Sequence, residues 1–264
     1  MGYEENKIEG RNAVLEAFRS GKTIDKLFVL DGCQDGPIKS ITREARKGDT
    51  IINYVAKERL DQISETGKHQ GVIAISAAYD YAEVEDILAN AEKKGEAPFI
   101  IILDGIEDPH NLGAIIRTAN QAGAHGIIIP KRRAVGLTPT VARTSAGAIN
   151  YTPVAKVTNL TQTIKELKDK GMWFVCADMN GTPMYDLNLT GSIGLVIGNE
   201  GDGVSKLVKE NCDMIATIPM KGDIDSLNAS VATGVLAYEI VRQRLGSNYW
   251  DNVHAQEIVK ISRR

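Results

Sequence analysis

The sequence predicts two α/β domains, a small one over residues 1–76 and a larger one with a parallel sheet over residues 98–250. Short apolar runs alternate with helical patterns through both blocks. In the second block the runs are apolar throughout, which is typical of parallel strands covered on both faces. The acidic stretch 77–97 separates the blocks, and we expect it to be a linker with a short helix; we expect residues 251–264 to form a C-terminal tail.

The elements of the small domain follow from its period-2 and helical stretches. We expect strands at 24–30, 50–54 and 71–76, and helices at 37–46 and 57–65. In the larger domain we expect strands at 99–103, 126–129, 172–177, 193–197 and 214–218, and helices at 111–122, 160–170, 204–210 and 227–244. Ligands of parallel sheets bind in the loops at the carboxyl ends of the strands, so polar motifs in those loops are site candidates.

Composition excludes several classes of protein. Apolar residues make up 43% and charged residues 25%, as in ordinary globular chains. No apolar run is long enough to span a bilayer, and the acidic first residues do not resemble a signal peptide, so we expect a cytoplasmic protein. Cys33, Cys176 and Cys212 are far apart and none has a histidine at ligand spacing, so we expect no disulfide framework and no metal site. Cys176, inside an apolar run, is interpreted as core.

The net charge of −3 at first disfavours a nucleic-acid partner. The surplus acid, however, lies in residues 77–97, which hold 2 Lys/Arg and 6 Asp/Glu. The flanking blocks are nearly neutral and can each carry a basic patch. The run containing Lys131 and Arg132 is one candidate for RNA binding, with a solvated loop as the alternative.

A glycine-rich loop, Gly198-Asn-Glu-Gly-Asp-Gly203, follows the predicted strand 193–197. Glycines allow positive φ and close approach of backbone to a ligand. The spacing matches neither the dinucleotide fingerprint nor a Walker loop. Glu200 and Asp202 would repel a pyrophosphate and suit a cationic or neutral ligand. A plain glycine turn is the alternative.

Two further segments carry candidates. Ile218, Met220 and Leu227 bracket a loop and could form the apolar wall of an adenine pocket, while Ser226 or Asn228 can cap the helix that follows. Upstream, Asn111 precedes or begins a helix and could be its N-cap, and Arg117 interrupts an otherwise apolar face. A lone helical arginine is more often a surface residue than a catalyst.

In order and spacing, the segments Asn111–Ala119, Gly198–Gly203 and Ile218–Ser230 resemble the three motifs of the SpoU (TrmH-type) ribose 2′-O-methyltransferases, of the SPOUT superfamily. The resemblance implies a trefoil-knotted methyltransferase domain, a homodimer, no metal, and S-adenosylmethionine as cofactor. The positions that match the family's catalytic residues are Asn111, Arg117, Glu200 and Asn228. The cofactor would lie against Ile197, Gly198, Asn199, Gly203, Ile218, Met220, Leu227 and Ala229.

The first block is similar to the N-terminal RNA-binding domain of the bacterial 23S ribosomal RNA guanosine 2′-O-methyltransferases (RlmB type), which looks like a small ribosomal protein. The similarity lies in Ile8–Ala17 and His69–Val72. It implies RNA contacts by Arg11, Asn12, His69 and Gln70. The alternative is that these residues cap and staple the small domain.

The resulting hypothesis is methylation of a ribose 2′-hydroxyl in structured RNA, with a guanosine of 23S ribosomal RNA as first candidate. A tRNA ribose methyltransferase would share every catalytic residue. A non-catalytic RNA-binding assembly protein is disfavoured by the intact motif residues, and a nicotinamide enzyme by the missing fingerprint. The family's base would be Arg117, but a guanidinium is hard to deprotonate. Arg117 could equally hold the target phosphate and stabilise developing negative charge.

Overall fold

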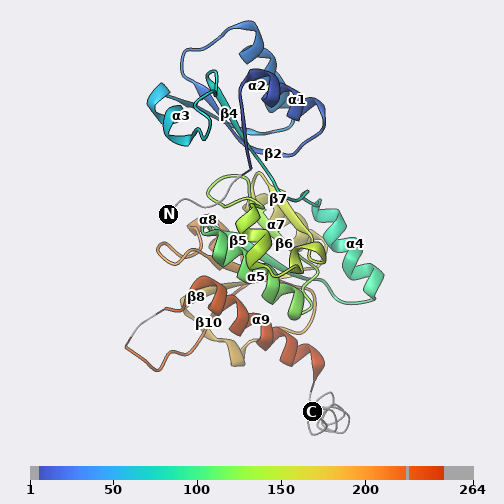
Figure 1. The fold of residues 1–264 in the computed structure, drawn as a ribbon. Helices are drawn as coiled ribbons and strands as arrows, with labels where there is room; N and C mark the ends of the chain where they lie inside the picture. Colours follow the sequence, from blue (N-terminus) through green and yellow to red (C-terminus); the bar gives the residue numbers. More distant parts are fainter. Residues whose placement is uncertain (1–5, 224–225, 247–264) are drawn as a thin grey trace, which may run out of the picture. The chain divides into compact units, whose positions relative to one another are not determined.

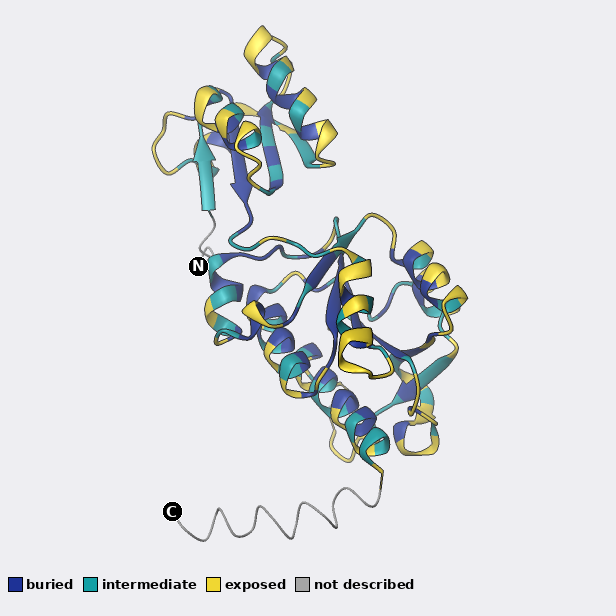
Figure 2. Ribbon diagram, turned by 90° about the vertical axis from the view of Figure 1, so that its right-hand side faces the viewer, coloured by how far each residue is buried: buried dark blue, intermediate teal, exposed yellow. Residues whose placement is uncertain are grey.

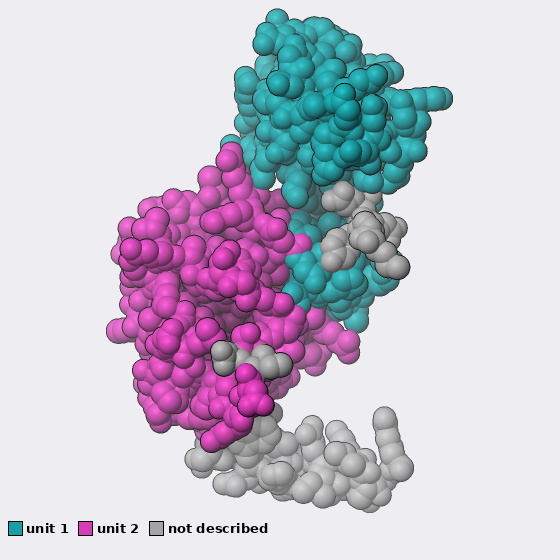
Figure 3. All heavy atoms as spheres, turned by 90° about the vertical axis from the view of Figure 1, so that its left-hand side faces the viewer, with its two compact units in different colours: residues 1–80, 108–113, 135–146 teal, residues 81–107, 114–134, 147–264 magenta. Residues whose placement is uncertain are grey.

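The computed structural model describes residues 6–223 and 226–246, so the predicted tail 251–264 lies outside the described residues (Figure 1). The chain divides into two compact units (Figure 3). The first unit comprises residues 1–80, 108–113 and 135–146, and the second comprises residues 81–107, 114–134 and 147–264. No described helix is long and apolar enough to cross a membrane.

The first unit is built on a four-stranded sheet. Its strands are β1 (Asn6–Glu9), β2 (Ile24–Leu30), β3 (Ile51–Val55) and β4 (Val72–Ser76), in the order β1-β4-β2-β3. β4 runs antiparallel to both β1 and β2, whereas β2 and β3 are parallel. Helices α1 (Arg11–Arg19) and α2 (Gly36–Lys47) share one apolar cluster with the sheet, and α3 (Lys57–Ile63) packs on a second, smaller one. The short helix α6 (Pro139–Thr144) is grouped with this unit.

The second unit contains a six-stranded sheet in which every pair of neighbours is parallel. The order is β10-β8-β9-β5-β6-β7. The strands are β5 (Phe99–Asp104), β6 (Gly126–Pro130), β7 (Val154–Val157), β8 (Trp173–Pro183), β9 (Ile193–Gly198) and β10 (Met214–Thr217). The helices are α4 (Val84–Lys94), α5 (Pro109–Gln121), α7 (Leu160–Asp169), α8 (Lys206–Glu210) and α9 (Ala229–Leu245), with 3-10 turns η1 (Ala148–Asn150) and η2 (Met184–Asp186). The start of α5, through Gly113, is grouped with the first unit.

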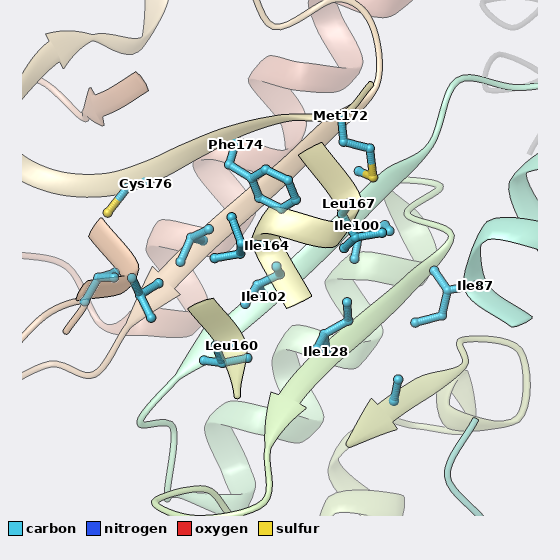
Figure 4. Close-up of a cluster of buried hydrophobic side chains, with 14 residues drawn as sticks. Ile87, Ile100, Ile102, Ile128, Leu160, Ile164, Leu167, Met172, Phe174 and Cys176 are labelled. Carbon is cyan, nitrogen blue, oxygen red and sulfur yellow. The ribbon is translucent and has the colours of Figure 1, made fainter. Parts of the chain in front are cut away.

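The inner strands β5, β6 and β9 are buried almost throughout, and the all-parallel sheet confirms the predicted α/β class (Figure 2). On one face, side chains of α4 and α7 meet Ile100, Ile128 and Phe174 in a buried apolar cluster (Figure 4). Cys176 belongs to this cluster and is fully buried, as its apolar run predicted. On α9, a Cβ placed on Gly234 would come within 3.8 Å of Thr118, so α9 and α5 lie side by side.

Helix α4 is the short helix expected within the segment 77–97, which was interpreted as a linker. Ile87 and Ala91 are buried, and a Cβ placed on Gly126 of β6 would come within 2.5 Å of Ile87. Asp86 and Glu83 form a capping box at its start, and Gly95 ends it in the left-handed region. The helix therefore packs against the sheet of the second unit through its apolar residues.

The predicted elements are all present, most with ends shifted by one to three residues. The described residues contain six further elements that were not predicted: β1, α1, α6, β7 and the 3-10 turns η1 and η2. The trefoil knot that the resemblance implies stays a prediction.

Candidate functional site

A cavity of about 590 Å³ lies at the carboxyl ends of β8, β9 and β10, where a parallel sheet is expected to bind its ligand. Its walls come from four stretches of the second unit: residues 177–180, 197–203 and 216–220, and the start of α9 with the residues before it. All eight positions expected to hold the cofactor line it: Ile197, Gly198, Asn199, Gly203, Ile218, Met220, Leu227 and Ala229. The structure thus gathers three segments that are up to thirty-odd residues apart in the chain into one cavity.

The glycine loop after β9 is folded tightly on itself. A Cβ on Gly198 would collide with the backbone of Gly203 and Val204, so only glycine fits there. The Oδ1 atom of Asn199 accepts hydrogen bonds from the amides of Gly201 (2.9 Å) and Asp202 (2.6 Å), which closes the turn. The loop is therefore a built element rather than a slack connection.

Asp104, at the end of β5, holds the exit of this loop. Its side chain is buried, and Oδ2 accepts a hydrogen bond of 2.8 Å from the amide of Ser205. A buried carboxylate that is satisfied by a backbone amide fixes the position of the chain. This residue was not among the sequence candidates, although a lone acid at the end of an apolar strand is a usable signal.

Glu200 and Asn228, two of the four predicted catalytic residues, are joined directly. The Nδ2 atom of Asn228 donates to Oε1 of Glu200 at 2.5 Å, and the amide of Ala229 donates to the same oxygen at 3.3 Å. Asn228 is also the N-cap of α9, accepting from the amides of Ser230 and Val231. Of the two expected capping residues, Asn228 is therefore the one used. The glycine loop and the start of α9 are tied together at the mouth of the cavity.

The other two predicted catalytic residues lie on α5. This helix begins at Pro109, and Asp108 accepts a hydrogen bond from the amide of His110, so Asn111 is in the first turn and is not the N-cap. The capping interpretation of Asn111 is wrong because the helix starts two residues earlier. Arg117 is exposed while its neighbours Ile115 and Ile116 are fully buried, as expected for a charge leaving an apolar face.

Gly113, between these residues, has a packing role. A Cβ at this position would come within 2.6 Å of the Thr144 side chain and 2.9 Å of the Val141 carbonyl oxygen, both in α6. α6 approaches α5 so closely that only glycine fits. The glycine of this motif is therefore explained by a helix that was not expected.

The charges around the cavity have one sign. Among the lining residues that the structure describes, the charged ones are Asp178, Glu200 and Asp202. Its apolar wall, on the other hand, includes the expected Ile218, Met220 and Leu227. The cavity thus combines an apolar side with an acidic rim, which suits a ligand that has a flat apolar part and a positive charge.

The wall formed by residues 177–180 was missed by the sequence reasoning. β8 leaves its register with β10 there: Cys176 pairs with Ile215, and Thr182 pairs with the next residue, Ala216. The β8 residues between these two pairs form a bulge beside the cavity. A polar run directly after an apolar strand was the signal that could have found it.

Asp178 organises this bulge. Its Oδ2 accepts from Lys209 Nζ at 2.6 Å and its Oδ1 from the amide of Asn180 at 2.9 Å. The Lys209 hydrogen bond, reinforced by the Asn180 amide, outweighs partial burial and lowers the pKa of Asp178 below its usual value. The carboxylate therefore stays ionised at neutral pH and faces the cavity from the β8 side.

The RNA-binding candidates of the first unit make internal contacts. The Arg11 guanidinium lies 2.6 Å from Asp35 and donates to the Gln70 carbonyl oxygen at 3.0 Å, while the Arg11 amide donates to Gln70 Oε1 at 3.2 Å. His69 is buried; its Nδ1 accepts from the amide of Gly71, and its Nε2 lies 2.9 Å from Asp61. These contacts hold the small domain together, which is the structural alternative stated for these residues.

The remaining candidates are more open. Asn12 is exposed on α1. In the second unit, Arg132 is exposed and Lys131 is half-buried, in the loop that follows β6. The amide of Lys131 donates to the Val157 carbonyl oxygen at 2.8 Å, so the loop is anchored at its start.

The chain matches two family models. Residues 98–238 match the SpoU rRNA Methylase family, and residues 7–82 match the domain described as RNA 2′-O ribose methyltransferase substrate binding. The chain belongs to the SpoU rRNA methylase family. The family predicted from the three motifs is thereby confirmed.

Relatives cover nearly the whole chain. The Bacillus subtilis (strain 168) protein YacO, which carries a TrmH family tRNA/rRNA methyltransferase name, is 48% identical over 92% of this chain and 98% of its own length. A similarly named protein of Staphylococcus epidermidis is 47% identical over 91% of this chain and 97% of its own.

Solved structures of this family share the fold. The SpoU methyltransferase AviRb of Streptomyces viridochromogenes, in complex with AdoMet, has a TM-score of 0.58 and 25% identity over 92% of this chain and 91% of its own. An AdoMet-bound rRNA methyltransferase from Sinorhizobium meliloti has the same TM-score and identity, over 92% and 89%.

Proposed function

We propose that this protein transfers the methyl group of S-adenosylmethionine to a ribose 2′-hydroxyl of structured RNA, with a guanosine of 23S ribosomal RNA as the target. The observation that carries the proposal is the cavity lined by all eight expected cofactor positions, with an acidic rim. The reaction would take place in the cytoplasm, where ribosomal RNA is assembled. Transfer RNA is the alternative substrate, because the same catalytic residues would serve it.

The cavity suits the proposed cofactor on two grounds. Gly198 lets the loop fold back tightly against Gly203 and Val204, and this folding places the loop backbone at the cavity wall. The acids of the lining complement a cationic ligand, and Ile218 and Leu227 offer apolar surface to a base. When bound, S-adenosylmethionine supplies a methyl group on a positively charged sulfur with a neutral thioether as leaving group.

The residues of this chain position the reactants. Glu200, held by Asn228 and the amide of Ala229, keeps the cofactor loop and α9 in one arrangement. Positioning two reactants contributes several kcal/mol to a transfer of this kind. Arg117 would act on the RNA side, either by accepting the proton of the 2′-hydroxyl or by holding the neighbouring phosphate and stabilising the developing negative charge. We favour the phosphate role, because a guanidinium loses its proton only above about pH 12.

We also propose a homodimer through the second unit. Along one side of α9, Val231 and Tyr238 are about half exposed, 50% and 52%, and Val235 lies between them. An uncovered apolar stripe on a helix is typical of a protein interface. Sedimentation at micromolar concentration should give a dimer, and a fully active monomer would contradict it.

The test of the function is direct. Purified protein is incubated with labelled S-adenosylmethionine and total RNA, and the labelled nucleotide is mapped. Label on a 23S guanosine ribose supports the proposal as stated. Label confined to tRNA would replace the substrate, and no transfer to any RNA would overturn the reaction.

A further inference from the structure

Helix α2 carries more exposed positive charge than any other helix of the first unit. Lys39, Arg43, Arg46 and Lys47 are all exposed, whereas Glu44 is the only carboxylate in the helix. These four cations form the basic stripe of α2. The first 76 residues are neutral in sum, so positive charge gathered on one helix is an asymmetry that composition hides.

The stripe is a consequence of the helix period. The buried residues of α2 are Ile38, Ile41, Thr42 and Ala45, which pack in the cluster shared with α1 or beside it. Positions 39, 43, 46 and 47 repeat at intervals of three and four and therefore share the outward side. Arg43 is about one turn, roughly 5–6 Å, from Lys39 on one side and from Arg46 and Lys47 on the other.

The internal partners of the stripe are weak. Glu44 lies 3.0 Å from Lys47 and 3.5 Å from Arg43, and both cations are well exposed. Exposed pairs of this kind gain little, so the cations can exchange Glu44 for an external anion. Lysine and arginine spaced along an outer face match the regular phosphates of a nucleic-acid backbone.

The opposite side of the same unit has no such excess. On α3, Lys57 and Arg59 alternate with Glu58 and Asp61. The residues first expected to bind RNA are also engaged: Arg11 is paired with Asp35, and the His69 ring is buried. An excess of exposed positive charge therefore distinguishes α2 from α3, and exposure distinguishes it from the paired Arg11 and the buried His69.

We propose that the basic stripe of α2 is the surface through which the first unit docks on the phosphate backbone of RNA. The inference rests on the proposed function and adds the docking face to it. Phosphate contacts position a partner without reading its sequence, so the stripe would set affinity and salt dependence rather than the choice of nucleotide.

The experiment compares two matched double variants of the full chain. Arg43→Gln with Arg46→Gln removes two cations from the stripe, and Lys57→Gln with Arg59→Gln removes two from α3. All four positions are exposed, and glutamine keeps helix propensity. Binding of a 23S ribosomal RNA fragment is measured as a function of salt concentration, together with the affinity for S-adenosylmethionine and the rate of methylation at saturating RNA.

The α2 variant should bind RNA about tenfold more weakly at 0.1 M salt, and the slope of log Kd against log salt should fall by about 2. Its affinity for S-adenosylmethionine and its rate at saturating RNA should equal those of the parent chain. The α3 variant should change RNA affinity less than twofold. Equal effects of the two variants, or an unchanged slope for the α2 variant, would overturn the docking surface. A parent chain that binds S-adenosylmethionine but methylates no RNA would instead overturn the proposed function.

Discussion

The two units use similar polar residues in opposite ways. In the second unit, Glu200 and Asp178 stand at the ends of strands around an open cavity. In the first unit, Arg11, His69 and Glu9 also stand at strand ends or turns, but their polar atoms are taken up by neighbours in the same unit. Residue type and position beside a glycine are therefore poor guides by themselves. Glu200 and Asp178 also have partners within their own unit, so the difference is that these two carboxylates line a cavity of that unit.

The strongest test of the cavity is Gly198→Val. A side chain there collides with the backbone of Gly203 and Val204, so the loop must open. Binding of S-adenosylmethionine, measured by calorimetry, should be lost. Gly222→Val is the matched control, because a Cβ at Gly222 meets nothing within 4 Å. Undiminished binding by the Gly198 variant would remove the loop from the cofactor site.

Arg117→Ala should come next in size. Arg117 is exposed and outside the cavity lining, so the variant should keep its fold and its affinity for S-adenosylmethionine. Methyl transfer should fall by well over tenfold, which corresponds to more than about 1.4 kcal/mol of transition-state stabilisation. Single-turnover rates with saturating RNA measure this. A loss below tenfold would exclude a catalytic role.

Asp178→Ala asks whether the unexpected wall contributes to binding. The substitution removes a charge-assisted pair with Lys209 and the turn at Asn180. We expect the Kd for S-adenosylmethionine to rise about tenfold, because such hydrogen bonds contribute about 1.5–3 kcal/mol before solvent screening. The control is Asp186→Ala, an exposed acid of η2. Equal affinities for both variants would show that the wall only frames the cavity.

The sequence predicted much of this fold because its strands and helices are strongly patterned. β2 is found over the predicted residues, and the parallel sheet follows from strands such as Phe99–Asp104, which is apolar up to its last residue. α6 and β7 have six and four residues, too few for a period to emerge. The wall at Asp178 depends on a change of register between β8 and β10, which is a long-range pairing that no local pattern encodes.

The internal contacts of His69 should contribute to the stability of the first unit. His69→Ala removes the acceptor for the amide of Gly71 and the partner of Asp61 in a buried place. We expect the free energy of unfolding of the first unit to fall by about 1–3 kcal/mol, since a buried amide is left without its hydrogen-bond acceptor. Amide hydrogen exchange of β4 measures this, with exposed Asn12→Ala as control. If His69→Ala left exchange unchanged and weakened RNA binding, His69 would be an RNA contact instead.

The smallest expected effect concerns Glu9, and it is a dependence on pH. Burial raises the pKa of this carboxyl, but hydrogen bonds from the hydroxyls of Ser64 and Thr66 and from the amide of Glu65 outweigh it and bring the pKa to about 2, from an ordinary 4.5. A carboxyl whose pKa is lowered by folding stabilises the folded state at pH values above the pKa that it has in the unfolded chain. That stabilisation is fully present above pH 4.5 and is lost as the pH falls from 4.5 toward 2.

Glu9→Gln should therefore lower the stability of the first unit at pH 7 and matter much less at pH 3. The full shift would correspond to about 3 kcal/mol, and the partial exposure of Glu9 reduces our expectation to about 1–2 kcal/mol. Urea titrations read from the backbone NMR signals of β4, at pH 7 and pH 3, measure the difference between variant and parent. A difference that stayed the same at both pH values would mean that the neutral side chain makes the same contacts. The charge of Glu9 would then not be what holds β1 to the 64–66 turn.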